Sequence, residues 1–404
     1  MWCAVESRVP TQRQFCMSYR VRALLHSAGA IAVCACSSSN TPTAIQTRDA
    51  VAAAAADSGF PFVTAHASAL PDLDDPSLAV AALNDFAEIV GTWSQNQSLP
   101  QAFKYQTTRG LTFLPHSDLQ DQTGAWAVNN RGQIAVSGVG PDFGSGIGIW
   151  AWNGNLTFLR PLTTFVSGRG NGCAPSAIND QGILAGVCET NSAPGWLATV
   201  WTAFGTPWAL RTRAGAFIQA AGVGPTVEAP AIGYTDSAYA SGAGTDGTGW
   251  VRSPAGDMRV VPKPTIGGTT YTIASLVVNN LGQAAGVASN PAAPRDCTHA
   301  IVSLSAASAV VDLGCGGAFG IDDHGTVVGT VNSRPVIWTA ATGLRQLPGL
   351  EGGAAKYRET GTAVAINHES QIIGTATMST GVTHKVLWTL SSEPGSAQTP
   401  AATR

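Results

Sequence analysis

Charged residues are scarce in this sequence, since Asp, Glu, Lys and Arg make up only 12% of its 404 residues. Soluble domains average about 25%, so the sequence does not favour charged amphipathic helices. Neither sign dominates, because 22 basic residues stand against 25 acidic ones and the net charge is −3. A strong positive field that would attract phosphate backbones is therefore missing, and we expect no nucleic-acid partner.

Long hydrophobic runs are missing after residue 40, so we expect no later segment to insert into a membrane. Glycine is abundant, with 46 residues, and so is tryptophan, with 11, while hydrophobic residues make up 44% of the chain. This combination is typical of many short strands joined by tight turns. The composition predicts an all-β fold.

The first forty residues differ from the rest of the chain. Arg20 and Arg22 precede an apolar run over residues 23–35, which is too short to span a bilayer comfortably as a mature helix. We therefore predict a signal peptide over residues 1–36, within which Met17 is expected to be the true start of translation. A Ser/Thr/Ala-rich stretch follows over residues 37–59 and is predicted to be a flexible tether.

The end of this apolar run, Val33-Cys34-Ala35-Cys36, resembles the lipobox of bacterial lipoproteins, in which the last cysteine is acylated. The resemblance implies a palmitate-type lipid anchor on Cys36, and Ser37 resembles the sorting signal for an outer membrane or cell surface. The alternative is ordinary signal cleavage after a small residue, which would yield a periplasmic or secreted protein.

A short motif recurs at intervals of 43 to 50 residues, and its clearest copy is Ala177-Ile178-Asn179-Asp180-Gln181-Gly182. An apolar pair ends a strand, Asn or Asp caps the turn, and the glycine supplies a positive φ. A second hairpin, with a glycine at its turn, follows in most copies. The Asn or Asp positions of the six clear copies are Asn84, Asn129, Asn179, Asn279, Asp322 and Asn367.

Two hairpins per repeat give four strands, which is the size of a propeller blade. We predict a β-propeller of about seven four-stranded blades over residues 60–390, followed by a disordered tail over 391–404. The degenerate stretch from about Ala214 to Val261 is expected to form the fourth blade, although an insertion is the alternative there. The strand from Phe62 to Leu70 should close the last blade beside Val386-Leu387-Trp388, whereas an open solenoid would leave exposed edges.

The repeat resembles the HAF family of probable extracellular bacterial repeat proteins, named for a His-Ala-Phe segment. His299-Ala300-Ile301, Gln101-Ala102-Phe103 and the strand that starts at His384 carry the resemblance, which covers roughly residues 60–390. It implies the fold and an exported location. It implies no particular activity.

Four cysteines remain after the leader, an even number in an oxidising compartment. A turn centred between Asp180 and Gln181 places Cys173 opposite Cys188, and a hairpin centred on Ala306 places Cys297 opposite Cys315. We predict both disulfides; free buried thiols are the alternative.

Motifs for chemistry are weak. The four histidines at 299, 324, 368 and 384 are interpreted as repeat or surface positions, not as metal ligands. The segment from Gly242 to Gly247 spells a dinucleotide fingerprint but precedes no helix. We expect no metal, no cofactor and no catalytic residue.

The tryptophans at 150, 201, 338 and 388 share one repeat position and should pack between blades. Five others are candidates for ligand contact: Trp126, Trp152, Trp196, Trp208 and Trp250.

The leading hypothesis is an exported, lipid-anchored, non-enzymatic propeller that binds a protein or glycan partner. The alternative is a lyase or hydrolase acting on polysaccharide from one propeller face. An enzyme should gather acidic, His or Arg residues from several blades around one end of the central channel, whereas Gly, Ala, Ser and Asn alone would argue against one.

Overall fold

The computed structural model describes residues 62–392 with gaps at 95–99, 115–122, 141–143, 161, 163–171, 190–195, 220–231, 294, 307 and 351–358. These residues lie in one compact unit, Ala50–Arg404. The predicted leader, Cys36 and the tether lie outside the described residues. None of the described helices is long and apolar enough to cross a membrane.

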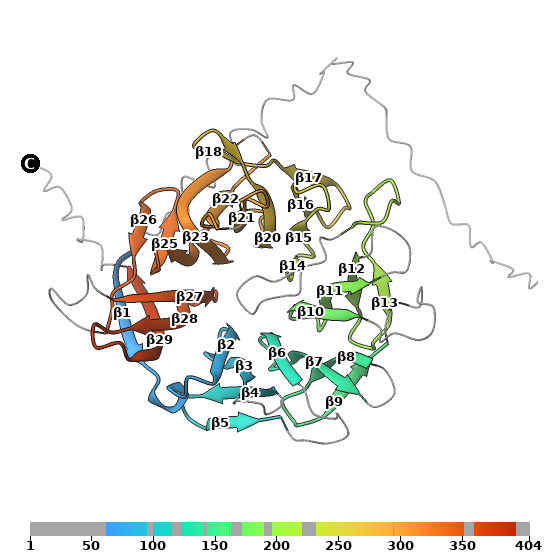
Figure 1. The fold of residues 1–404 in the computed structure, drawn as a ribbon. Helices are drawn as coiled ribbons and strands as arrows, with labels where there is room; N and C mark the ends of the chain where they lie inside the picture. Colours follow the sequence, from blue (N-terminus) through green and yellow to red (C-terminus); the bar gives the residue numbers. More distant parts are fainter. Residues whose placement is uncertain are drawn as a thin grey trace, which may run out of the picture. The chain divides into compact units, whose positions relative to one another are not determined.

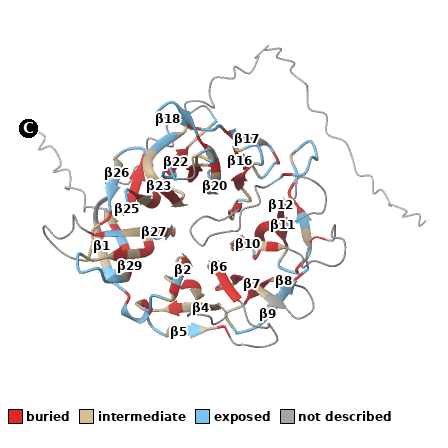
Figure 2. Cartoon of the chain, viewed as in Figure 1, coloured by how far each residue is buried: buried red, intermediate tan, exposed pale blue. Residues whose placement is uncertain are grey.

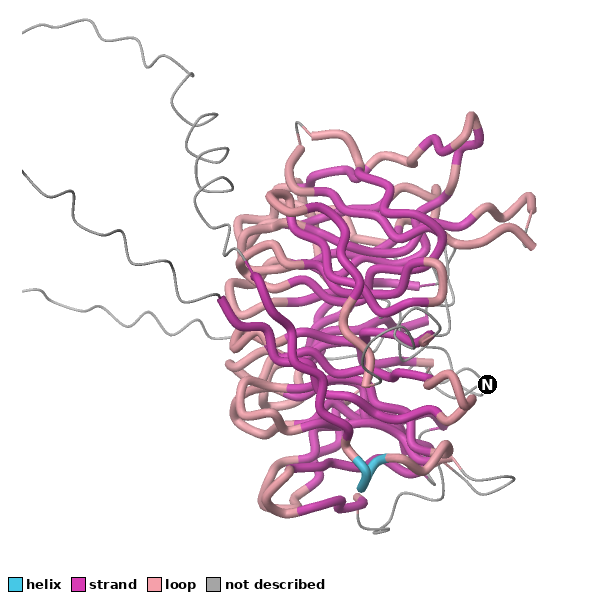
Figure 3. Tube along the Cα trace, turned by 90° about the vertical axis from the view of Figure 1, so that its left-hand side faces the viewer, coloured by secondary structure: helices cyan, strands magenta, loops and turns pink. Residues whose placement is uncertain are grey.

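The described chain is all-β, as the composition predicts, and its antiparallel sheets stand around a central axis as in a propeller (Figure 1). Five sheets have four strands each, and a sixth has seven strands, in which β23 pairs with β22 on one side and β24 on the other. Figure 3 shows the strands from the side, with the 3-10 turn η1 (Pro71–Leu73) in cyan.

The four-stranded sheets follow the repeats along the chain. The first three contain β2 (Leu78–Leu83), β3 (Ile89–Trp93), β4 (Gln101–Gln106) and β5 (Gly110–Phe113); β6 (Thr123–Val128), β7 (Ile134–Gly140), β8 (Gly144–Trp150) and β9 (Leu156–Leu159); and β10 (Cys173–Ile178), β11 (Leu184–Glu189), β12 (Trp196–Trp201) and β13 (Pro207–Ala209). The fourth contains β14 (Ile232–Tyr234), β15 (Ala240–Ala243), β16 (Gly249–Arg252) and β17 (Met258–Val261). The degenerate stretch is therefore a full sheet of four strands, not an insertion.

The seven-stranded sheet follows a small hairpin of β18 (Thr265–Ile266) and β19 (Thr269–Thr270). Its strands are β20 (Thr272–Val278), β21 (Ala284–Ser289), β22 (His299–Ser303), β23 (Val311–Ile321), β24 (Val327–Val331), β25 (Arg334–Thr339) and β26 (Gly343–Gln346).

The last sheet joins the two ends of the described chain. Its strands are β27 (Thr360–Ile366), β28 (Gln371–Thr377), β29 (Thr383–Ser392) and β1 (Phe62–Ala69). Strand β1 pairs antiparallel with β29, with Ala69 opposite Val386 and Ala67 opposite Trp388. The predicted closure by the N-terminal strand is confirmed, and it removes the free edge of an open array. Strand β29 continues to Ser392, two residues past the predicted end of the propeller.

Buried residues concentrate on the inner and middle strands, while outer strands such as β5 carry exposed ones (Figure 2). Trp150 packs with residues of two consecutive sheets, among them Val90 and Ile134, and Trp388 packs with Ile337 of the preceding sheet. Trp201 and Trp338 lie in corresponding clusters. The prediction that this repeat position packs between blades is confirmed.

A β-bulge explains the glycine seven residues after the repeat Asn. The pairing of β10 with β11 shifts register between Pro175 and Ala177, which pushes a backbone carbonyl toward the facing strand. A Cβ on Gly186 would lie 2.1 Å from the carbonyl oxygen of Ala174, so a side chain has no room there. The bulged residue, Ser176, lines the central channel.

Candidate functional site: the polar mouth of the central channel

The repeat Asn caps its own turn, as the sequence predicts. The side-chain oxygen of Asn84 accepts hydrogen bonds from the backbone N–H groups of Phe86 and Glu88, both at 3.0 Å. A residue at positive φ closes the turn, for example Gly182 at 77°. The turn therefore ends strand β2 and starts β3 at one end of the channel.

The same Asn has a second role that sequence reasoning missed. Its Nδ2 donates to the backbone carbonyl of the corresponding turn in the next sheet, as Asn84 does to Asn129 at 3.0 Å. Asn367 completes the closure by donating to Asn84 at 2.9 Å. The other bonds of this kind run from Asn129 to Asn179, from Asn179 to Thr235 and from Asn279 to Asp322. The Asn position thus connects neighbouring sheets.

The residue after the repeat Asn also reaches the next turn. The backbone N–H of Asp85 donates to the side chain of Asn130, whose own N–H donates to Asp180 at 2.7 Å. The N–H of Asp180 in turn donates to Asp236 at 2.6 Å. A signal for this arrangement was present in the sequence, because nearly every copy has Asp or Asn at this position.

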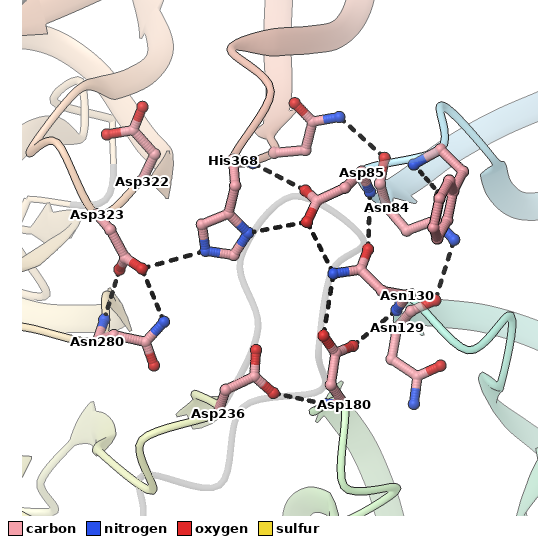
Figure 4. A network of polar contacts seen from close by, with 12 residues as sticks. Asn84, Asp85, Asn129, Asn130, Asp180, Asp236, Asn280, Asp322, Asp323 and His368 are labelled. Atoms are coloured by element: carbon pink, nitrogen blue, oxygen red, sulfur yellow. Dashed lines mark hydrogen bonds and ion pairs between the residues drawn. The ribbon is translucent and has the colours of Figure 1, made fainter.

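These turns surround a cavity of about 180 Å³ at the mouth of the channel. Figure 4 shows that the second turn residues of several sheets point toward one another there. Five carboxylates line the cavity from four different turns: Asp85, Asp180, Asp236, Asp322 and Asp323. Asp322 caps its own turn, and the other four are the second residues of their turns.

His368 is the basic group among the described residues that line this mouth. Its Nδ1 lies 3.3 Å from Oδ2 of Asp85, and its Nε2 lies 3.2 Å from Oδ2 of Asp323. The hydrogen bond to Asp323 raises the pKa of His368 to about 9, against the opposing effect of burial and with further help from Asp85. The imidazole is therefore protonated at neutral pH and bridges two carboxylates.

The carboxylates differ in their electrostatic environment. Burial by itself would raise the pKa of Asp323, but hydrogen bonds from His368 and Asn280 outweigh it and lower this pKa to about 2. Asp236 has no such cation in contact, and burial raises its pKa, with the neighbouring charge of Asp180 adding to the rise. A cation bound beside Asp236 would therefore stabilise the ionised form of this carboxyl.

Behind the polar mouth the channel is apolar. A second cavity, of about 240 Å³, shares Leu83, Ile178 and Ile366 with the first and is lined mostly by aliphatic residues. Trp126 lies here, where its indole N–H donates to Ser137 at 2.7 Å. This tryptophan faces the channel and not the outer surface.

The other four candidate tryptophans have different surroundings. Trp152 lines a separate pocket of about 190 Å³, with Lys104 4.0 Å and Arg109 5.3 Å from the centre of its ring. Trp208 is exposed at 40%. Trp196 is half-buried against the core, and Trp250 is 5% exposed within it, so its ring is not available at the surface.

Both predicted disulfides are present, Cys173–Cys188 and Cys297–Cys315. Cys173 lies directly opposite Cys188. The second pairing is diagonal, because Cys315 lies opposite His299 and not opposite Cys297. The strands near the turn are centred just past Ala306, and a register shift between Ala300 and Ile301 adds a further residue. The predicted hairpin centre at Ala306 is therefore displaced, although the bond itself is confirmed.

Two of the other histidines each lie beside one carboxylate. His384 lies 2.7 Å from Asp74, and His324 lies 3.6 Å from Asp322 within one turn. Among the described residues, one group has the spacing of metal ligands, namely Cys297, His299 and Cys315, and its two sulfurs are bonded to each other. The four histidines thus do not form a common site.

The mouth gathers acidic residues and a histidine from several sheets, which is the arrangement that the enzyme hypothesis requires. The same groups are, however, committed to contacts between turns, because the carboxylates accept backbone N–H groups and both nitrogens of His368 face carboxylates. Geometry alone therefore leaves both functional hypotheses open at this point.

Comparison with protein-family models gives no match to the sequence, and comparison with curated proteins gives none either. Among solved structures, the chain is similar to TolB from Acinetobacter baumannii (TM-score 0.39, 13% identity, covering 76% of this chain and 64% of that one). It is also similar to YCF48 bound to D1 peptide (0.44, 8%, 82% and 98%) and to the polysaccharide lyase Uly1 (0.40, 8%, 75% and 88%). The chain spans less than two thirds of the TolB structure, and resemblances at this level carry no inference about function.

Proposed function

We propose that this chain is an exported, lipid-anchored propeller that binds a protein partner by taking a positively charged side chain into the mouth of its channel. The observation that carries the proposal is the convergence of Asp85, Asp180, Asp236 and Asp323 on one small cavity. His368 neutralises part of this charge, so a net negative potential remains for a lysine or arginine.

Three further features belong to this proposal. The seven-stranded sheet is counted as two blades that share β23, which makes a ring of seven. The Cys36 lipid would hold the domain at a membrane surface. The two disulfides are in keeping with an oxidising, extracytoplasmic location.

Binding is favoured over catalysis by the state of His368. A general base needs a free nitrogen within reach of the substrate, whereas this imidazole is protonated at neutral pH, and each nitrogen lies about 3 Å from a carboxylate oxygen. The backbone N–H groups that bind the carboxylates further fix them as structural acceptors. A rigid anionic socket is better suited to recognition than to proton transfer.

The experiment measures binding of the purified domain to matched peptide libraries rich in Lys and Arg, or in Asp and Glu. We expect retention of basic peptides that weakens with salt, and a loss of about tenfold in Asp236→Asn, since bonds to charged groups contribute about 1.5 to 3 kcal/mol. Asn at this position keeps the acceptor for Asp180. The matched control is Asp257→Asn, which removes an exposed carboxylate of the same sheet that pairs with Arg213.

Failure to prefer basic peptides, or equal loss in the control variant, would contradict the proposal. Polysaccharide cleavage that disappears in Asp236→Asn would instead support the alternative of a lyase or hydrolase.

An acidic glycan is a second candidate partner, favoured by the separate pocket at Trp152. Lys104 and Arg109 both lie over this indole. The lining is completed by Gln106, Gly110 and Thr112. An aromatic face with two cations suits a sugar that bears a carboxylate. On a glycan array, Trp152→Ala should lose acidic glycans while Trp208→Ala keeps them; equal binding by both variants would exclude this pocket.

A further inference from the structure

The disulfide Cys297–Cys315 differs from an ordinary structural bridge because a histidine and an aspartate stand beside it. We propose that this disulfide is redox-active and oxidises a dithiol substrate, with His299 transferring the proton. This inference concerns a site apart from the channel mouth and goes beyond the binding function proposed above.

The backbone register brings the three groups together. His299 lies opposite Cys315 on the paired strands β22 and β23, and Cys297 precedes His299 by two residues, so all three lie on one face. The Nε2 atom of His299 is 3.7 Å from Sγ of Cys297. The two sulfurs and a ring nitrogen of His299 lie within 4.8 Å of one another.

Asp312 positions the imidazole from the facing strand. Its Oδ1 lies 2.9 Å from Nδ1 of His299 and also accepts the N–H of Gly314 at 3.0 Å. Since an ionised carboxylate only accepts, Nδ1 carries a hydrogen, and in the neutral imidazole the lone pair of Nε2 faces Sγ of Cys297. The ring of Tyr271 packs against His299 edge to face at 4.9 Å. The arrangement of cysteine, histidine and acid is the one that activates thiols in nucleophilic enzymes.

Access distinguishes this disulfide from the other one. Cys297 is exposed and Cys315 half-buried, whereas Cys173 and Cys188 are 5% and 0% exposed within a hydrophobic cluster. A thiol can therefore reach Cys297 without opening the fold, but must wait for local opening to reach the buried pair.

Oxidation of a dithiol substrate by this disulfide takes two exchange steps. A thiol of the substrate loses its proton to Nε2 of His299, and the thiolate attacks Sγ of Cys297 while the bond to Cys315 breaks. Cys315 leaves as a thiolate and takes the proton from His299. The second thiol of the substrate then attacks the mixed disulfide at the substrate's own sulfur, and its proton goes to the departing Cys297. The substrate becomes a disulfide, and the protein gains two electrons and two protons.

The test is graded reduction of the full chain with dithiothreitol, followed by thiol alkylation and peptide mass spectrometry. We expect Cys297 and Cys315 to be labelled at least tenfold faster than Cys173 and Cys188. His299→Gln should slow labelling of the first pair by about a hundredfold, the lower end of the range for a lost acid–base group, and should leave the second pair unchanged.

Asp312→Asn keeps the acceptor for Gly314 and serves as a second variant in case His299→Gln disturbs the hairpin. We expect it to slow exchange at Cys297 without changing the melting temperature, and Asp312→Glu to restore part of the rate. The proposal is overturned if both disulfides are reduced at the same rate, or if neither the His299 nor the Asp312 variant alters the rate in a folded protein.

Discussion

The turns that begin at Asn279 and Asp322 lie next to each other at the channel mouth, and their first residues differ in one chemical group, an amide against a carboxyl. Each side chain caps its own turn: Asn279 accepts the N–H of Leu281, and Asp322 accepts that of His324. Asn279 also donates from Nδ2 to the carbonyl of Asp322 at 2.8 Å. An ionised Asp322 has no hydrogen to donate toward the next turn.

This difference separates two roles that the repeat position combines. Capping needs only an oxygen, so Asn, Asp and Thr all serve, and Oγ1 of Thr235 accepts the N–H of Tyr239. Connecting one sheet to the next also needs an amide N–H. Asp322 lacks this N–H, and its carboxyl is buried. Burial raises the pKa of Asp322, so the ionised form is disfavoured in the folded state.

The largest loss of stability is expected when a substitution removes both the capping oxygen and the connecting N–H of a repeat Asn. Asn129→Ala loses the caps on Arg131 and Gln133 and the donor to Asn179. Because the site is buried, we expect a loss of about 3 kcal/mol in the free energy of unfolding, measured by denaturant titration. A loss no greater than that of an exposed control, Asn153→Ala, would contradict the two roles.

A smaller loss should follow when only the donor is removed. Asn129→Asp keeps the capping oxygen but places a buried acid against the carbonyl of Asn179, and we expect about 2 kcal/mol at pH 7. The pKa of such an acid is raised in the folded state, so the loss should shrink as the pH falls through this raised pKa and should vanish below the ordinary Asp value of about 4. A loss independent of pH would show that charge is not its cause.

The reverse change at the exceptional turn should stabilise the protein. Asp322→Asn supplies the missing donor and removes a buried acid, so we expect a gain of about 1 kcal/mol at pH 7. The raised pKa of Asp322 means that the wild type loses stability as the pH rises from about 4 through this pKa. The free energies of unfolding of the wild type and of Asp322→Asn, measured from pH 3 to 7, should therefore converge at the acidic end. Divergence at low pH would refute the assignment.

The smallest effect is expected at Thr235, whose cap is already made by a hydroxyl. Thr235→Asn adds a donor toward the neighbouring turn at Asn279, and we expect a gain of about 0.5 kcal/mol, because Thr and Asn are similar as caps. Thermal unfolding beside the wild type measures it. A loss of stability would mean that the degenerate turn has its own geometry and cannot adopt the repeat contact.

Much of the architecture was accessible from the sequence because the signals were local. The turn at Asn179, the positive φ of Gly182 and the spacing of Cys173 from Cys188 depend on residues close in the chain. The hydrogen bond from Asn84 to Asn129 was not accessible, since the sequence shows that Asn caps a turn but not what its Nδ2 contacts. The bulge beside Gly186 and the register shift beside Cys297 were not accessible either, because local spacing does not reveal how two strands pair.

The mouth itself was predicted only in part. Asp or Asn after the repeat position is evident in the sequence, and closure of the ring brings these side chains together. The role of His368 could not be inferred, because its two partners come from other repeats. Asp323 belongs to the preceding turn, and Asp85 belongs to the other end of the described chain. Trp250 was predicted as a candidate for ligand contact because it lies off the repeat position, but it packs in the core.

The central claim is that the mouth is a fixed anionic socket in which His368 is a bridging cation and not a free base. The most direct measurement is the titration of the His368 ring by NMR in the full domain. The account predicts a pKa of about 9, well above the ordinary 6.5, which falls in Asp323→Asn. A pKa near 6.5 that is unchanged in Asp323→Asn would contradict it and would make His368 a candidate catalytic base.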